Sequence, residues 1–180
     1  MRKRIFWITE TAMMLALLIV LQWATKPLGQ LVTGVCVNTV LATVAMAVGL
    51  SGGLTVALLS PVFAFLLGIA PNVVTVPAIM AGNAVFVLLL RLLSGKCWWR
   101  NVVSVVVSAA GKFGVLYALV NWVICGLLAD TLLAQGVLKA PMLKALPVSF
   151  GIMQLMTALL GGSLALTIAS VLKKTLGKNR

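Results

Sequence analysis

The chain has 180 residues, of which 62% are hydrophobic and 9% are charged, and its mean hydropathy is +1.18. A soluble domain is about half apolar and about a quarter charged, so this composition excludes an ordinary soluble protein and predicts a polytopic membrane protein. The net charge of +12 does not indicate a nucleic-acid partner, because the basic residues flank apolar runs instead of lining one face.

Six apolar segments follow one another, each with close to the ~20 residues that a spanning helix needs. They run over Ile5–Ala24, Leu31–Leu50, Gly53–Ala70, Val73–Leu93, Val102–Ala129 and Val148–Leu172. We therefore predict an all-α protein with a single six-helix transmembrane domain over residues 1–180. Ser51 and Gly52 form a tight link between the second and third segments, and the long fifth segment is expected to be tilted, or bent at Gly111 or Gly114. The basic N-terminus and first segment resemble a signal peptide, but no clear cleavage site follows and we expect no cleavage.

The basic residues predict the orientation. With six spans, ten of the 14 basic residues fall on the side of the two chain ends and three fall on the other side, while Lys112 lies within a segment. The ten are Arg2, Lys3, Arg4, Arg91, Lys96, Arg100, Lys173, Lys174, Lys178 and Arg180; the three are Lys26, Lys139 and Lys144. An excess of this kind marks the cytoplasmic side, so both termini are predicted to be cytoplasmic.

Two connections on the outer side stand out. Residues 70–77 contain two prolines, and residues 130–147 form a long, moderately apolar connection. A long connection of this kind is either a lid or binding loop, or an amphipathic linker on the membrane surface.

The chain lacks the residues of most catalytic chemistry. It has no histidine, its only acidic residues are Glu10 and Asp130, and its three cysteines are far apart without a CxxC pair. General acid–base catalysis, a metal site and a cofactor are therefore not expected, and the chain is not expected to be an enzyme. An ion-coupled carrier usually keeps a carboxylate within the membrane, so that class is disfavoured too.

Lys112 is the most informative residue, because a cation at the centre of a membrane helix costs about 2.5–3.5 kcal/mol. Its partner could be backbone carbonyls, amide side chains or an anionic ligand. Several polar and aromatic residues, Asn38 among them, are expected at similar depth, which is typical of a pocket open to the outside. The predicted substrate-binding residues are Asn83, Lys112, Tyr117, Asn121, Trp122 and Gln154. The amides could instead only tie helices together, and Lys112 and Asn121 share a pocket only if their helix bends.

Ala12 and Ala16 form a small-xxx-small pair in the first segment, which allows another helix to approach closely, either from a partner or within the chain.

The chain resembles the substrate-binding S components of energy-coupling factor (ECF) transporters, which are bacterial vitamin importers of the ABC type. The resemblance covers nearly the whole chain and rests on its size, six spans, cytoplasmic ends, Ala12 and Ala16. It also rests on the sequences TGVCVN at 33–38, LSP at 59–61 and PAIMAGN at 77–83.

The resemblance implies a multi-pass protein of the bacterial cell membrane that captures a small water-soluble vitamin or related nutrient at the outer face. A membrane coupling subunit would dock on Ala12 and Ala16, and two ATPase subunits would hydrolyse ATP. From the residues we add that a carboxylate on this nutrient could pair with Lys112. The alternatives are a passive small-solute channel acting as a homo-oligomer, or a membrane assembly factor that transports nothing.

Overall fold

The computed structural model describes residues 2–176, and within that range the chain is helical with no strand. The long helices are α1 (Arg2–Thr25), α2 (Gln30–Ala47), α3 (Leu50–Leu66), α4 (Thr75–Leu93), α5 (Trp98–Tyr117) and α8 (Ile152–Leu176). The short elements are the 3-10 turn η1 (Lys26–Leu28), the π-helical stretch η2 (Ala118–Leu127), α6 (Ala129–Ala134) and α7 (Ala140–Ser149). The expected all-α class is confirmed.

Five helical segments are long and apolar enough to cross a membrane, and large apolar side chains cover their outer surface. The segments are Arg4–Leu28, Gln30–Ala47, Thr75–Leu93, Trp98–Leu127 and Ala140–Val171. α3 is apolar but has only 17 residues, which is about 26 Å of helix. Leu66, Trp122 and Leu127 are each at least 71% exposed. Such a surface is stable against lipid tails and not against water, which indicates a membrane-embedded helical bundle.

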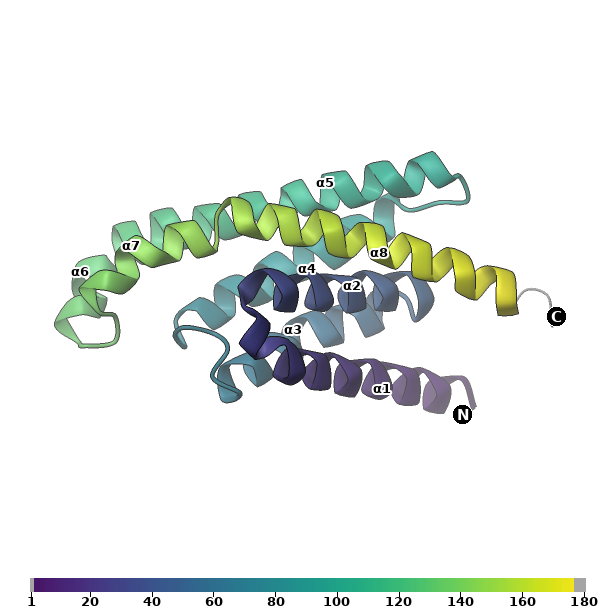
Figure 1. The fold of residues 1–180 in the computed structure, drawn as a ribbon, viewed down its shortest axis with the longest axis horizontal. Helices are drawn as coiled ribbons and strands as arrows, with labels where there is room; N and C mark the ends of the chain where they lie inside the picture. Colours follow the sequence, from purple (N-terminus) through teal and green to yellow (C-terminus); the bar gives the residue numbers. More distant parts are fainter. Residues whose placement is uncertain (1, 177–180) are drawn as a thin grey trace.

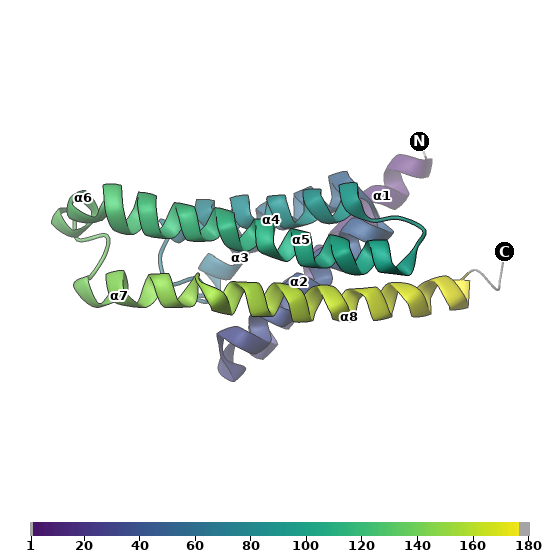
Figure 2. The ribbon, with the colours of Figure 1, turned by 90° about the horizontal axis from the view of Figure 1, so that it is seen from above.

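α5 and α8 run along the long axis of an elongated molecule (Figure 1), and α1 crosses them obliquely when the molecule is seen from above (Figure 2). The start of α1 and the end of α8 lie at the same end, whereas α6 lies at the other end (Figure 1). α2 packs most extensively against α8, and α4 against α5. α5 and α8 also contact each other and run side by side when the molecule is seen from above (Figure 2).

The link between α2 and α3 lies three residues earlier than expected. It consists of Val48 and Gly49, whereas Ser51 and Gly52 lie in the first turn of α3. Gly49 has a φ of +109°, a conformation that residues with a Cβ atom rarely adopt. The turn therefore requires glycine at position 49, and the expected link at Ser51 and Gly52 is wrong.

The fifth apolar stretch changes its helix type at Ala118 instead of bending at Gly111 or Gly114. The α-helix continues through both glycines to Tyr117 and then becomes π-helical up to Leu127. A Cβ atom at Gly111 would collide with the side chain of Leu89, so this glycine permits the close packing of α4 on α5.

The connection over residues 130–147 is folded into the helices α6 and α7. Its apolar residues Leu138 and Leu146 pack with Phe150 against η2 and α4. Asn72, in the connection between α3 and α4, donates a hydrogen bond of 2.6 Å to the Val137 carbonyl and so joins two connections. The last long helix therefore begins at Ile152, after α7, and not at Val148 as expected.

Two apolar clusters divide the core along its length. The larger cluster includes Phe86 and Leu90 of α4 and Ala109 of α5, on the side of the chain ends. The smaller cluster includes Ala78 of α4 and Leu116 of α5, toward α6 and α7. A layer of polar side chains lies between the two clusters, and it contains the candidate site.

Candidate functional site

The Lys112 side chain stands at the centre of the polar layer and joins three helices. Its Nζ donates hydrogen bonds of 2.6 Å to Asn38 Oδ1 on α2 and of 2.8 Å to Asn83 Oδ1 on α4. All three residues are at most 2% exposed. The Phe86 ring centroid lies 5.7 Å from Nζ, which adds a favourable cation–π contact. The partners of the buried cation are thus amide side chains.

Asn38 is held in turn by the close packing of α2 on α8. Its Nδ2 donates to the Gly34 carbonyl at 2.9 Å and to Thr157 Oγ1 at 3.2 Å. A Cβ atom added at Gly161 would lie 2.7 Å from both Asn38 Cβ and the Val35 carbonyl oxygen. Glycine at position 161 therefore lets α8 approach α2 closely enough for the bond to Thr157.

The charge of Lys112 is solvated but not neutralised. Glu10 and Asp130, the only acidic residues of the chain, are both exposed, and neither contacts Lys112. An ammonium has three N–H donors, and the two amide oxygens accept from two of them. One donor and a net positive charge remain available in this layer.

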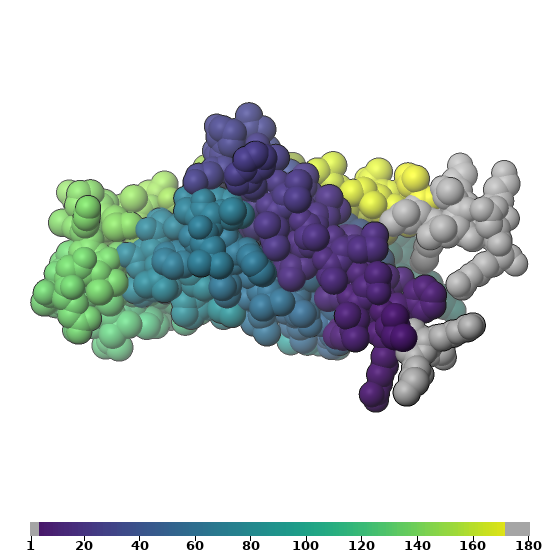
Figure 3. Space-filling view, turned by 90° about the horizontal axis from the view of Figure 1, so that it is seen from below, coloured from purple at the N-terminus to yellow at the C-terminus, as the bar shows by residue number. Residues whose placement is uncertain are grey.

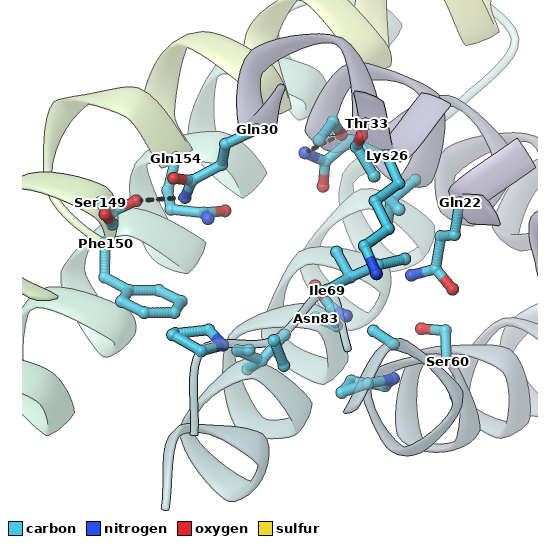
Figure 4. A pocket seen from close by; sticks show the side chains of 18 of the residues that line it. Gln22, Lys26, Gln30, Thr33, Ser60, Ile69, Asn83, Ser149, Phe150 and Gln154 are labelled. Carbon is cyan, nitrogen blue, oxygen red and sulfur yellow. Dashed lines mark hydrogen bonds between the residues drawn. The ribbon is translucent and has the colours of Figure 1, made fainter. Parts of the chain in front are cut away.

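A pocket with a volume of about 310 Å³ opens onto the polar layer (Figure 4). This volume is at the lower end of the range of small-molecule sites, which is about 300–1,000 Å³. Polar lining residues come from several helices and include Gln22, Lys26, Gln30, Thr33, Asn38, Ser60, Asn83, Lys112 and Gln154. Apolar lining residues include Val37, Pro61, Ile69, Pro71, Ile79 and Phe150.

Hydrogen bonds between separate elements surround this pocket. Lys26 Nζ donates to the Leu67 carbonyl at 2.8 Å, and Gln30 Nε2 donates to the Ser149 carbonyl at 2.8 Å (Figure 4). The first bond joins the turn after α1 to the end of α3, and the second joins α2 to α7. Both are exposed, so water competes with them and they hold the pocket walls weakly.

The structure brings three of the six predicted substrate-binding residues together. Asn83, Lys112 and Gln154 line the pocket. Tyr117 and Trp122 are 44% and 71% exposed and do not line it, and Asn121 donates to the Tyr117 carbonyl at 3.1 Å. These last three belong to the end of α5 and to η2, where the helix turns their side chains away from the pocket.

Several pocket residues were not predicted, among them a polar group from α1, η1, α2 and α3. Gln22, Lys26, Gln30, Thr33 and Ser60 belong to this group. The sequence feature that could have indicated them is the presence of polar residues, such as Gln22 and Ser60, within strongly apolar segments.

Ala12 and Ala16 lie on the outside of the bundle. Both are exposed, whereas Thr11 and Leu18 on the same helix are buried against its neighbours. α1 lies uncovered along one face of the molecule, in purple in Figure 3. The close approach that these alanines allow is therefore not used within the described chain.

Comparison with protein-family models, characterised proteins and solved structures finds no match to this chain.

Proposed function

We propose that the chain is the substrate-binding S component of an ECF-type ABC importer. In this function it captures a small water-soluble vitamin or related nutrient at the outer face of a bacterial plasma membrane. Both termini lie in the cytoplasm, as the distribution of basic residues indicates. The pocket then opens to the outside, because it lies near η1 and the 67–74 connection, away from the chain ends (Figure 1).

The observation that carries this proposal is a mainly apolar pocket that ends on a few buried polar side chains, with the packed apolar core beyond them. Asn38, Asn83 and Lys112 form its floor, and Phe86 and Leu41 lie beyond them, each 0% exposed. A floor of this kind supports capture of one small molecule more than conduction of a stream of solutes. The two lysines of the pocket, with no carboxylate beside them, favour a nutrient that carries a carboxylate.

Energy for uptake must come from other subunits in this proposal. The part of the chain that the structure describes holds no carboxylate in the polar layer that could couple transport to an ion gradient. The exposed alanines of α1 are the docking face for the membrane coupling subunit, because small side chains let a second helix approach closely. Two ATPase subunits then supply ATP hydrolysis.

The test is purification of the tagged chain from its native membranes in mild detergent, with mass spectrometry of the proteins that accompany it. We expect a membrane coupling subunit and two ATPases. The double substitution Ala12→Leu/Ala16→Leu should remove them and leave the bundle folded. Ala110→Leu is the matched control, since Ala110 is also exposed but belongs to α5. Recovery of the chain alone or only with itself would refute the proposal and favour a homo-oligomeric channel.

A further inference from the structure

Two buried polar groups of the pocket have no hydrogen-bond partner among the described residues. Gln22 Oε1 on α1 and Ser60 Oγ on α3 are both unpaired, although the residues are only 4% and 0% exposed. Both residues line the pocket, and their polar ends lie on the same side of it in Figure 4. A buried polar group without a partner destabilises the free protein, so its presence calls for an explanation.

Ser60 differs from the other buried hydroxyls in the described helices, because each of those donates a hydrogen bond to a backbone carbonyl. Thr11, Thr43 and Ser108 each donate to the carbonyl four residues earlier, at 2.6–2.8 Å, as buried hydroxyls in helices commonly do. Ser60 makes no such bond. Its hydroxyl is therefore free to donate to, and accept from, a molecule in the pocket.

Gln22 lies one turn after Leu18 on the buried face of α1, so its amide faces the pocket and not the lipid. It makes no hydrogen bond with a described residue, and an amide offers both a donor and an acceptor. Gln22 and Ser60 are also not bonded to each other. A ligand group that donates and accepts could therefore pair with both.

A cation lies beside this pair. The Lys26 ammonium points into the pocket near Gln22 (Figure 4). One of its three donors is used by the Leu67 carbonyl, and no acidic residue lines the pocket. An anionic group would meet two free N–H donors of Lys26 without repulsion from a carboxylate.

We propose that Gln22, Ser60 and Lys26 form a subsite for a small carboxylate that also carries a hydroxyl or a carboxamide group. Lys26 binds the carboxylate, and the second group donates to Gln22 and accepts from Ser60. This inference rests on the proposed function and specifies the chemical class of the nutrient. It assigns recognition of the charge to Lys26, while Lys112 holds the pocket floor.

The rest of the pocket sets the size and shape of this molecule. Its volume of about 310 Å³ equals that of about ten water molecules, so a compound of about ten non-hydrogen atoms fits. Phe150, Ile69 and Ile79 supply an apolar wall against which a flat ring can pack. A monocyclic carboxylate with one polar substituent combines these properties.

The experiment measures binding to the full chain in lipid nanodiscs by titration calorimetry. The probes are 3-hydroxybenzoate and 3-carbamoylbenzoate. Their controls are 3-methylbenzoate, which lacks the donor, 3-hydroxybenzamide, which lacks the charge, and the cationic 3-hydroxybenzylamine. We expect at least one of the first two compounds to bind about tenfold more tightly than every control, and the better of the two distinguishes a hydroxyl from a carboxamide.

Variants connect this preference to the named residues. Gln22→Met and Ser60→Ala should each abolish the advantage of the probe over 3-methylbenzoate. Neither should lower the melting temperature of the free protein, because each removes an unpaired buried group. Lys26→Met should weaken binding of the two probes, 3-hydroxybenzoate and 3-carbamoylbenzoate, about tenfold and leave binding of 3-hydroxybenzamide unchanged. The controls are Gln135→Met, Ser163→Ala and Lys144→Met, which change exposed residues outside the pocket.

The outcomes separate this inference from the proposed function. Any of four results would overturn the subsite. 3-Methylbenzoate could bind as tightly as the better probe, 3-hydroxybenzylamine could bind more tightly than either probe, or no compound could bind. In the fourth, the Gln22 and Ser60 variants would still bind the probe more tightly than 3-methylbenzoate. In the last case water would be the partner of Gln22 and Ser60. The proposed function would survive each of these results if the coupling subunit and ATPases still purify with the chain. It would fail by itself if the subsite is confirmed and no such partners are found.

Discussion

The substitution Lys112→Met tests whether the buried ammonium holds the bundle together. It leaves Asn38 Oδ1 and Asn83 Oδ1 without their donor in a layer where both residues are 1% exposed. Two buried acceptors without a donor lower the free energy of unfolding by about 2–6 kcal/mol together. Removal of a cation from an apolar layer recovers about 2.5–3.5 kcal/mol. The net change in the free energy of unfolding is therefore expected to lie between a gain of about 1.5 kcal/mol and a loss of about 3.5 kcal/mol, with the protein still folded.

A double-mutant cycle with Asn83 measures how much the bond from Lys112 stabilises the bundle. Asn83→Leu removes one of the two acceptors, and Lys112 is the only hydrogen-bond partner of the Asn83 side chain among described residues. The double variant Lys112→Met/Asn83→Leu should be more stable than the sum of the two single losses predicts, by about 1–3 kcal/mol, because no Asn83 oxygen is stranded. Reversible unfolding in mixed micelles supplies the free energies. Additive losses would show that the bonds to Lys112 do not stabilise the bundle.

Three further predictions concern packing, the pocket boundary and orientation. Gly161→Ala should lower the free energy of unfolding by about 1–3 kcal/mol, because its Cβ atom would lie 2.7 Å from the Val35 carbonyl oxygen. In the control Gly114→Ala, the Cβ atom meets nothing within 4 Å, so this variant should raise the free energy of unfolding by about 1 kcal/mol. Trp122→Leu should leave calorimetric binding of 3-hydroxybenzoate unchanged, because Trp122 is 71% exposed outside the pocket; weaker binding would extend the site to η2. Cys97 is exposed between α4 and α5, so a membrane-impermeant maleimide should label it in inside-out vesicles of a variant without the other two cysteines. Labelling in intact cells would contradict the predicted orientation.

The helical membrane character of the chain could be predicted from sequence because it depends on composition and length alone. Runs of about 20 apolar residues leave the backbone no alternative to helix in a lipid environment. Helix boundaries were less predictable, since they depend on single turns. The link at Gly49 required a positive φ that the neighbouring Gly52 could equally have supplied.

Part of the site could also be predicted from the sequence, because it depends on how deep a polar residue lies within an apolar segment. A lysine at the centre of an apolar segment must have polar partners, so Lys112 and amides such as Asn83 could be identified from their depth alone. Tyr117, Asn121 and Trp122 lie at a suitable depth too. They nevertheless do not line the pocket, and depth along a helix does not report which face of the helix a residue occupies.

The sequence by itself therefore determined that the chain forms apolar helices around one buried cation, because a lysine at the centre of an apolar helix requires polar partners wherever that helix packs. Only the tertiary structure decided which groups meet that cation. Asn38 and Asn83 lie 74 and 29 residues from Lys112 along the chain, and close packing of α2 on α8 at Gly161 helps to hold Asn38 in place. Gln22 and Ser60 likewise belong to different helices. Their common pocket arises from how the helices rotate and approach one another, a property of packing between distant segments and not of any one of them.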